Sequence, residues 1–226
     1  MPPPGHMCGL GAKAPARIGG FADAKSEASQ HVANLGLAAW LAADTVRIVL
    51  FARDLKTDLL DIVAGFLFLL TAIFVLRRAR PFAQDARPSA VAAALSATML
   101  PVLLDWLAPA QGTHTFALVG QGIAVLLMGS GLLYLGRNFS ILPQYRSIVT
   151  GGPYAVVRHP IYGSYLIFDG TLVLETQSWL GVALWLAEFG FLLVRARFEE
   201  RLLAANDPTY GQYLARVRWR FVPGVG

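Results

Sequence analysis

The sequence of 226 residues has few charged residues and almost no cysteine. Only 15% of its residues are Asp, Glu, Lys or Arg, against about a quarter in an ordinary soluble domain. Cys8 is the single cysteine, which excludes an internal disulfide and a thiolate metal cluster. The four histidines lack HxxxH and HExxH spacing, so we expect no metal site.

Long apolar runs take the place of the missing charge. Four of them are predicted to be transmembrane helices, at about residues 32–51, 59–76, 89–107 and 116–135. A further run, "YLIFDGTLVLETQSWLGVALWLAEFGFLLV", is interrupted by "ETQS", and each half is near or below the roughly 20 residues that cross a bilayer. We therefore expect an all-α polytopic transmembrane bundle of about four single spans, a C-terminal helical hairpin and cytoplasmic C-terminal helices.

Some charged residues fall within these apolar segments. Asp44 and Arg47 are three residues apart, so they can neutralise each other on one helical face. Asp169 and Glu188 lie in the two halves of the hairpin, and acids within a membrane are functional candidates by default. Asp169 is a candidate for the lining of a substrate channel.

The net charge of +5 comes from arginines that cluster in particular loops. They lie in 77–88, 136–160 and the region after 195, whereas 108–115 and "ETQS" contain no Lys or Arg. This pattern indicates membrane orientation, with both termini and the arginine-rich loops cytoplasmic, and it does not favour a nucleic-acid partner. The Ala- and Arg-rich composition favours a bacterial inner membrane.

Three regions are predicted from the composition. Residues 1–30, rich in Pro, Gly and Ala, are expected to form a flexible tail. Residues 31–135 would hold the first four spans, and residues 136–226 the functional region.

The loop "GGPYAVVRHPIYGSY", residues 151–165, contains the first candidate site. Pro160 suits the first turn of a helix, which places Arg158 and His159 at a helix N-terminus. Free backbone N–H groups and the helix dipole favour a carboxylate or phosphate there. The alternative is that the arginine follows the positive-inside rule and the tyrosines lie at the membrane interface, with no bound ligand.

The second candidate site is "RARFEERLL", where Glu199 and Glu200 follow the apolar "FGFLLV" by one helical turn. Adjacent carboxylates at an apolar boundary need cationic partners, and Arg195 or the amino group of a ligand would serve. The alternative is a solvated helix with surface salt bridges.

Together these segments resemble a known family. "GGPYAVVRHPIYGSY", then "FEERLL" and "DPTYGQYLARVRWRFVPG", are similar in order and spacing to the isoprenylcysteine carboxyl methyltransferase family, which shares this pattern with bacterial phospholipid N-methyltransferases. The resemblance covers about residues 136–226. It implies a multispan membrane enzyme that uses S-adenosylmethionine without a Rossmann domain, and no GxGxxG motif follows a strand pattern here.

The resemblance also implies a set of site residues. Those expected to bind the cofactor are Leu142, Arg146, Ser147, Ile148, Val149, Tyr154, His159, Pro160, Ile161, Tyr162 and Glu199. The catalytic set is Arg195, Arg158 and Glu200. Arg195 would face the methyl acceptor, Arg158 suits the cofactor's carboxylate, and Glu200 or a tyrosine would take a proton from an amine acceptor.

The acceptor is open at this stage. A carboxylate of an isoprenylcysteine-like or other lipid is the first prediction, and a phospholipid amine or a small thiol are alternatives. The expected partners are a lipophilic substrate and the bilayer. A catalytically inactive lipid-binding protein is a further hypothesis. A transporter would show polar residues along a continuous path, whereas the ionisable residues gather at one face.

Overall fold

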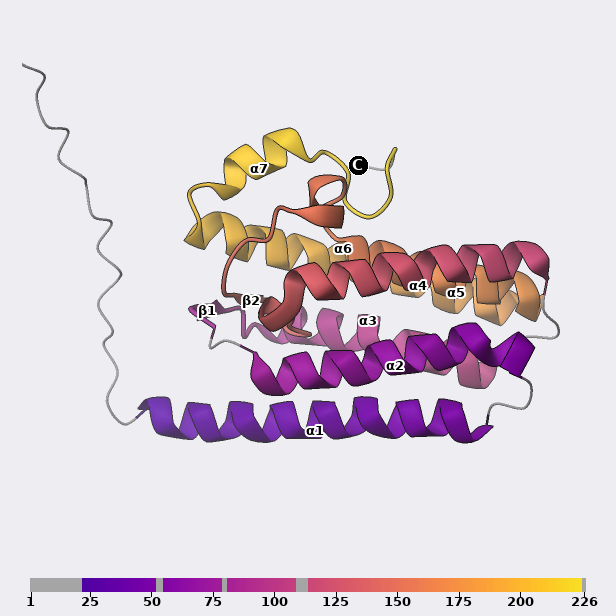
Figure 1. Ribbon diagram of the computed structural model, residues 1–226. Coiled ribbons are helices and arrows are strands. Elements are labelled where there is room, and N and C mark those ends of the chain that lie inside the picture. The colour runs from indigo at the N-terminus through magenta and orange to yellow at the C-terminus, as the bar shows by residue number, and fades with distance from the viewer. Residues whose placement is uncertain (1–21, 52–54, 79–80, 109–113, 225–226) are drawn as a thin grey trace, which may run out of the picture.

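The computed structural model describes residues 22–51, 55–78, 81–108 and 114–224. Six long helices lie side by side and run alternately in opposite directions (Figure 1). They are α1 (Ala22–Phe51), α2 (Leu55–Arg77), α3 (Pro88–Leu107), α4 (Thr115–Leu135), α5 (Pro160–Thr176) and α6 (Trp179–Asn206). The short helix α7 (Tyr210–Arg216) follows them. The predicted all-α bundle is confirmed.

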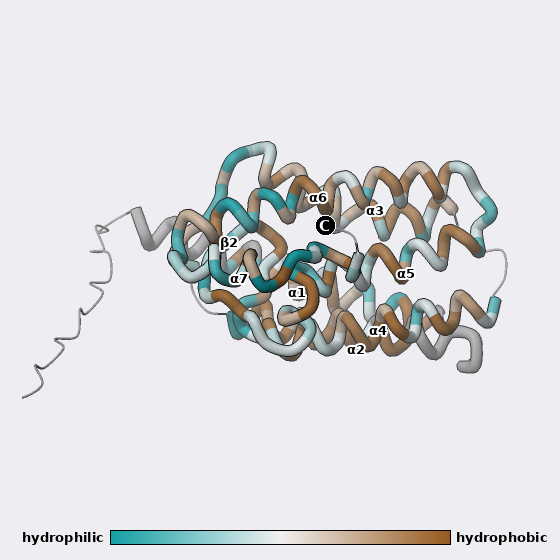
Figure 2. The backbone as a smooth tube through the Cα atoms, turned by 90° about the horizontal axis from the view of Figure 1, so that it is seen from above, coloured by the Kyte–Doolittle hydropathy of each residue, from teal (hydrophilic) through white to brown (hydrophobic). Residues whose placement is uncertain are grey.

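Three of the described helices are long and apolar enough to cross a membrane. They are α3, α4 together with the turn that follows it to Asn138, and α6. Many large apolar side chains on the long helices face outward, such as Leu126 at 75% exposed, as expected for contact with lipid. Hydrophilic residues gather at the ends of the bundle, most densely around α7 and β2 (Figure 2). These features indicate an integral membrane protein.

The predicted hairpin is confirmed, whereas the last part of the predicted N-terminal tail is helical. Helix α5 ends at Thr176 and α6 begins at Trp179, with Gln177 in the left-handed conformation (φ 48°) between them. Helix α1 begins at Ala22, so residues 22–30 of the expected flexible tail are helical. Their Ala, Lys and Glu residues have high helix propensity, which extends the helix beyond its apolar part. Residues 1–21 lie outside the described residues.

The helices pack in pairs: α1 against α2, α3 against α6, and α4 against α5. The largest cluster of buried apolar residues joins these pairs, with contributions from α2, α3, α4, α5, α6 and the C-terminal tail, among them Val75, Ala97, Leu132, Leu166, Leu192 and Phe221. In α4, Gly131 lets the helix approach Ile161 of α5, because a Cβ atom there would lie 2.9 Å from that side chain. The result is a bundle whose core lies where α5 begins.

The loops that carry the arginines meet at one end of the bundle, where α1, α3 and α5 begin (Figure 1). Two short strands, β1 (Ala83–Gln84) and β2 (Gln144–Tyr145), pair antiparallel there. The single 3₁₀ turns η1 (Gly136–Asn138) and η2 (Gly152–Ala155) lie in the loop between α4 and α5. Gly152 has φ +58°, which a residue with a side chain rarely adopts. This end of the bundle holds the candidate site.

Candidate active site

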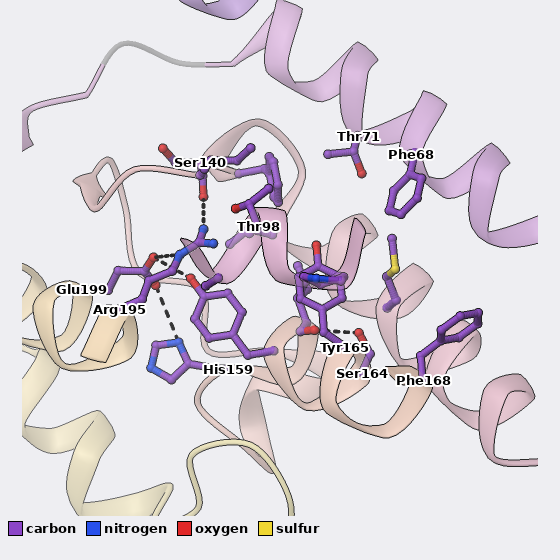
Figure 3. Close-up of a pocket in the computed structure, with 18 of the residues that line it drawn as sticks. Phe68, Thr71, Thr98, Ser140, His159, Ser164, Tyr165, Phe168, Arg195 and Glu199 are labelled. Carbon is purple, nitrogen blue, oxygen red and sulfur yellow. Dashed lines mark hydrogen bonds and ion pairs between the residues drawn. The ribbon is translucent and has the colours of Figure 1, made fainter. Parts of the chain in front are cut away.

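A cavity of about 680 Å³ extends from the loop end of the molecule into the helical bundle. We call one part the polar end, lined by Arg146, Tyr154, His159, Tyr162, Arg195, Glu199, Tyr210 and Tyr213. We call the other part the apolar arm, lined mainly by α1–α5 with residues such as Trp40, Phe68, Ala97, Val125, Met128 and Phe168. Figure 3 shows His159, Arg195 and Glu199 converging at one side of this space, with Phe68 and Phe168 at the other.

Glu199 is the centre of the polar end. Its carboxylate accepts a hydrogen bond from the Tyr162 hydroxyl at 2.5 Å and from Arg195 Nε at 3.2 Å, and lies 3.7 Å from His159 Nδ1 (Figure 3). The imidazole of His159 stacks on the Tyr162 ring with centroids 5.1 Å apart. Three side chains, from α5, from the residue before it and from α6, therefore fix a single carboxylate at the wall of the cavity.

Arg195 is held almost entirely out of contact with solvent, with 3% of its surface exposed. Its guanidinium lies 4.8 Å above the Tyr162 ring and donates to the carbonyl of Ser140 at 3.1 Å. An arginine needs such partners when it is buried, since an unpaired charge is costly in a low-dielectric interior. These contacts leave Arg195 beside Glu199 where the polar end meets the apolar arm.

Glu200 serves a different cluster. It accepts from Arg158 at 2.9 Å and from Arg220 at 3.2 Å, and its Oε1 lies 3.2 Å from His159 Nε2. The backbone N–H groups of Arg158 and His159 donate to the carbonyls of Trp219 and Arg220 at 2.9 and 2.8 Å. The anion position that the sequence predicts at this helix N-terminus is therefore filled by Glu200 and the C-terminal tail.

Most of the predicted site residues line the cavity. They are Leu142, Arg146, Ser147, Ile148, Val149, Tyr154, Arg158, His159, Ile161, Tyr162, Arg195 and Glu199. Pro160 and Glu200 do not line it. Pro160 is fully buried in the first turn of α5, and Glu200 turns to the arginines described above. Arg158 reaches the cavity wall with its guanidinium bonded to Glu200 and to the Arg218 carbonyl.

Sequence reasoning missed other residues of the cavity wall. Asn138, Phe139 and Ser140 come from the loop after α4 and show no motif that would indicate a site. Tyr210 and Tyr213 are three residues apart on one face of α7, a spacing that could have singled them out. The Tyr213 hydroxyl donates to the carbonyl of Tyr154 at 2.8 Å, which ties α7 to the loop before α5.

The titratable groups of the loops and α7 are shifted by burial. Burial lowers the pKa of Arg146 to about 10, with the charge of Arg78 adding to the effect, so its guanidinium stays charged at neutral pH. Burial is also the main cause that raises the pKa of Tyr213 to about 12 and that of Tyr154 above its ordinary value. These tyrosines are neutral phenols at physiological pH and offer aromatic faces and hydrogen-bond donors.

A largely apolar cavity with a few converging polar groups is typical of a small-molecule binding site. Residues 114–211 match the family model of the phospholipid methyltransferases. This segment runs from the start of α4 into α7 and includes most of the polar end. The match covers less than half of the chain; it indicates a methyltransferase and agrees with the resemblance seen in the motifs.

Among solved structures, the chain is similar to the eukaryotic intramembrane Ras methyltransferase ICMT (isoprenylcysteine carboxyl methyltransferase). The two chains are 19% identical, 86% of each is covered, and the TM-score is 0.43. A comparison with curated proteins finds no match.

Proposed function

We propose that this methyltransferase takes its methyl group from S-adenosylmethionine, bound at the polar end, and transfers it to a lipophilic acceptor in the apolar arm. The observation that carries the proposal is the position of Glu199. A carboxylate held by Tyr162 and Arg195 lies in the same cavity as the apolar wall of the bundle.

The residues of the polar end fit this cofactor. A volume of about 680 Å³ is within the range of roughly 300–1,000 Å³ that is usual for small-molecule sites. Glu199 would hold the α-ammonium, and the charged Arg146 would hold the carboxylate in place of the filled position at Arg158. The rings of Tyr154, Tyr210 and Tyr213 offer faces for the adenine and the sulfonium.

S-Adenosylmethionine supplies a methyl group already activated on a sulfonium. The contribution of the protein is then to orient the acceptor and to exclude water, and orientation alone can contribute roughly 7–11 kcal/mol. The buried Arg195 can position an acidic acceptor at the junction of the polar end and the apolar arm. The apolar side chains of the arm keep the junction dry.

A lipid carboxylate, of the isoprenylcysteine-like or another kind, is the acceptor that these residues favour. A carboxylate needs no proton acceptor, and Arg195 offers it a guanidinium. For an amine acceptor, Glu200 or a tyrosine is the expected base. Glu200 does not line the cavity, and burial raises the pKa of Tyr154 and Tyr213, which do. The second candidate acceptor is a phospholipid amine, which is favoured by the match to the phospholipid methyltransferase family.

We further propose that the polar end faces the cytoplasm of a bacterial inner membrane, with both termini on that side. The support is the arginine-rich loops, which lie with the polar end at one end of the bundle (Figure 1).

Both predicted regions, 31–135 and 136–226, contribute to the cavity, so the boundary between them does not separate the site from the bundle.

The proposal is tested by titrating S-adenosylmethionine into the detergent-solubilised protein in a calorimeter. Replacing Glu199 by Gln removes the charge opposite the ammonium and is expected to weaken binding about tenfold or more. Arg201→Gln is the matched control, because Arg201 is an exposed residue two positions further along α6. Equal affinity in wild type and Glu199→Gln would contradict the proposed cofactor site.

A further inference from the structure

The apolar arm contains an acidic side chain that the proposed chemistry does not use. Asp169 of α5 is 6% exposed and lines the cavity. Glu188 of α6 interacts with it, is 1% exposed and does not line the cavity. Apart from Asp169, neither oxygen of Glu188 has a hydrogen-bond partner among the described residues. Two carboxyl groups thus meet inside the bundle, and one of them faces the cavity.

Other acids of the bundle are compensated within the protein. Asp44 and Asp105 both pair with Arg47, at 2.8 and 3.2 Å. Glu175 accepts from the backbone N–H of His114 at 2.8 Å. For Asp169, by contrast, the one side-chain hydrogen-bond partner found among the described residues is the other acid, Glu188, and no cation pairs with it there.

An uncompensated pair of carboxyls is costly in a low-dielectric interior. Two adjacent carboxyls cannot both be ionised there without a cation or a donor, and a buried acceptor without a donor is destabilising. A proton shared between Asp169 and Glu188 would bridge α5 and α6, but it would not require Asp169 to face the cavity. The side of Asp169 that faces the cavity would accept from a donor that a ligand brings.

The distance between the acid pair and the polar end can be calculated from α5 and from α6 separately. Asp169 lies seven residues beyond Tyr162 in α5, and Glu188 lies seven residues before Arg195 in the antiparallel α6. At about 1.5 Å per residue, each separation is roughly 10 Å along the helix axis. The acid pair therefore lies well inside the arm, about two turns from the junction.

We propose that Asp169, supported by Glu188, is a second polar anchor that binds a hydrogen-bond-donating group, a hydroxyl or an ammonium, on the chain of the acceptor. The donor group lies part-way along the chain, about 10 Å from the end that receives the methyl group. This inference rests on the proposed function and deepens it: the acceptor is a functionalised amphiphile, and a plain hydrocarbon tail leaves Asp169 unsatisfied.

The test compares matched single-chain acids as ligands of the whole protein saturated with S-adenosylhomocysteine, the cofactor without its methyl group, so that no acid is methylated during the titration. Dissociation constants are measured for hexadecanoic acid and for its 8-hydroxy, 8-amino and 16-hydroxy derivatives. The 8-substituted acids should bind about tenfold more tightly than hexadecanoic acid, and the 16-hydroxy acid should gain nothing. The relative gains of the 8-hydroxy and 8-amino acids show which donor the anchor prefers.

Asp169→Leu should abolish this preference, and Thr171→Val should keep it, because Thr171 is on the same helix but does not line the cavity. If Asp169→Leu does not fold, Asp169→Asn is used and should reduce the preference. Equal binding of all four acids to the wild type would overturn the inference. Thermal stabilisation by S-adenosylmethionine is recorded for the same protein preparations without acid, so loss of the cofactor response would count against the proposed function instead.

Discussion

Glu199 and Glu200 are adjacent in α6, and the helix directs their side chains to different partners. Glu199 lines the cavity and binds Tyr162 and Arg195. Glu200 holds Arg158 and Arg220 together beneath the start of α5. The cavity side of Glu199 can thus meet the charge of a ligand, whereas Glu200 links α6 to the loop before α5 and to the C-terminal tail.

Asp207 gives a pH-dependent prediction at the scale of single residues. Its carboxylate accepts from the Thr209 hydroxyl and N–H at 2.6 and 2.9 Å, and from the Tyr145 hydroxyl at 3.3 Å. The hydrogen bonds from Thr209 are the main cause that lowers the pKa of Asp207. A lowered folded-state pKa adds stability above the unfolded value of about 3.9, and this stability is lost as the pH falls through the folded-state pKa.

We therefore expect Asp207→Asn to lower the Tm by about 2–4 °C at pH 7, the effect of losing roughly 1 kcal/mol in a protein of this size. The difference from the wild type should shrink as the pH falls below about 4. Thermal unfolding at a series of pH values checks this. A difference that stays constant down to pH 3 would show that the charge of Asp207 is not the cause.

Local sequence patterns predicted residues whose partners are near in the chain. The pair Asp44–Arg47 and the position of Pro160 in the first turn of α5 follow from helical spacing and the properties of proline, and both are confirmed. The pairing of Arg220 with Glu200 was not predicted, because it depends on how the tail returns to α6. The roles of the individual site residues remain predictions.

At the scale of elements, the C-terminal tail after α7 packs across the start of α5 and holds it in place. Its backbone carbonyls accept from Arg158 and His159, and the Phe221 ring packs edge-on against His159 and Tyr162. In α5, Gly163 allows this approach, because a Cβ atom there would lie 2.3 Å from the carbonyl oxygen of Phe221. The tail therefore orients the two rings that surround Glu199.

The variant Gly163→Ala tests whether the C-terminal tail holds the start of α5 in place. The added methyl group must displace the tail backbone, so we expect a loss of about 1–3 kcal/mol of stability and weaker binding of S-adenosylmethionine. Gly190→Ala is the matched control in α6, where a Cβ atom would meet no atom within 4 Å. That variant should be neutral or slightly stabilising, since Ala favours a helix over Gly. Similar stability and cofactor affinity in the two variants would contradict the role of the tail.

The positions of the helices along the chain could be predicted because hydropathy and helix-breaking residues are properties of the local sequence. The hairpin follows from "ETQS" and the length of the apolar run, and the structure confirms it. The extension of α1 to Ala22 was missed because helix propensity without an apolar face is a weak signal. The apolar arm was not predicted either, since it arises from the packing of α1–α5 and no single segment encodes it.

For the whole molecule, charged groups extend further from the polar end than the sequence suggested. Asp169, Glu188, Asp105 and Arg47 lie deeper in the bundle or toward its other end. Among the described residues at that other end, Asp44 and Asp105 both pair with Arg47, and this region lies opposite the arginine-rich loops (Figure 1). The molecule is thus asymmetric along the direction in which it would cross a bilayer.

Orientation in the membrane can be measured with single cysteines in a Cys8→Ser background. Phe82 is 80% exposed near the polar end, and Gln177 lies at the opposite turn of the hairpin. In intact bacterial cells, an impermeant maleimide should label Gln177→Cys and leave Phe82→Cys unlabelled until the cells are opened. Labelling in the reverse pattern would place the polar end outside the cytoplasm.

The central claim is that one cavity brings S-adenosylmethionine to a lipophilic acceptor. The most direct test incubates the purified protein with methyl-labelled S-adenosylmethionine and a total lipid extract, and follows the label by mass spectrometry of the organic phase. The account predicts a labelled lipid with the wild type and a strong loss of label with Glu199→Gln. Label that never enters a lipid, or that enters equally with both proteins, would contradict it.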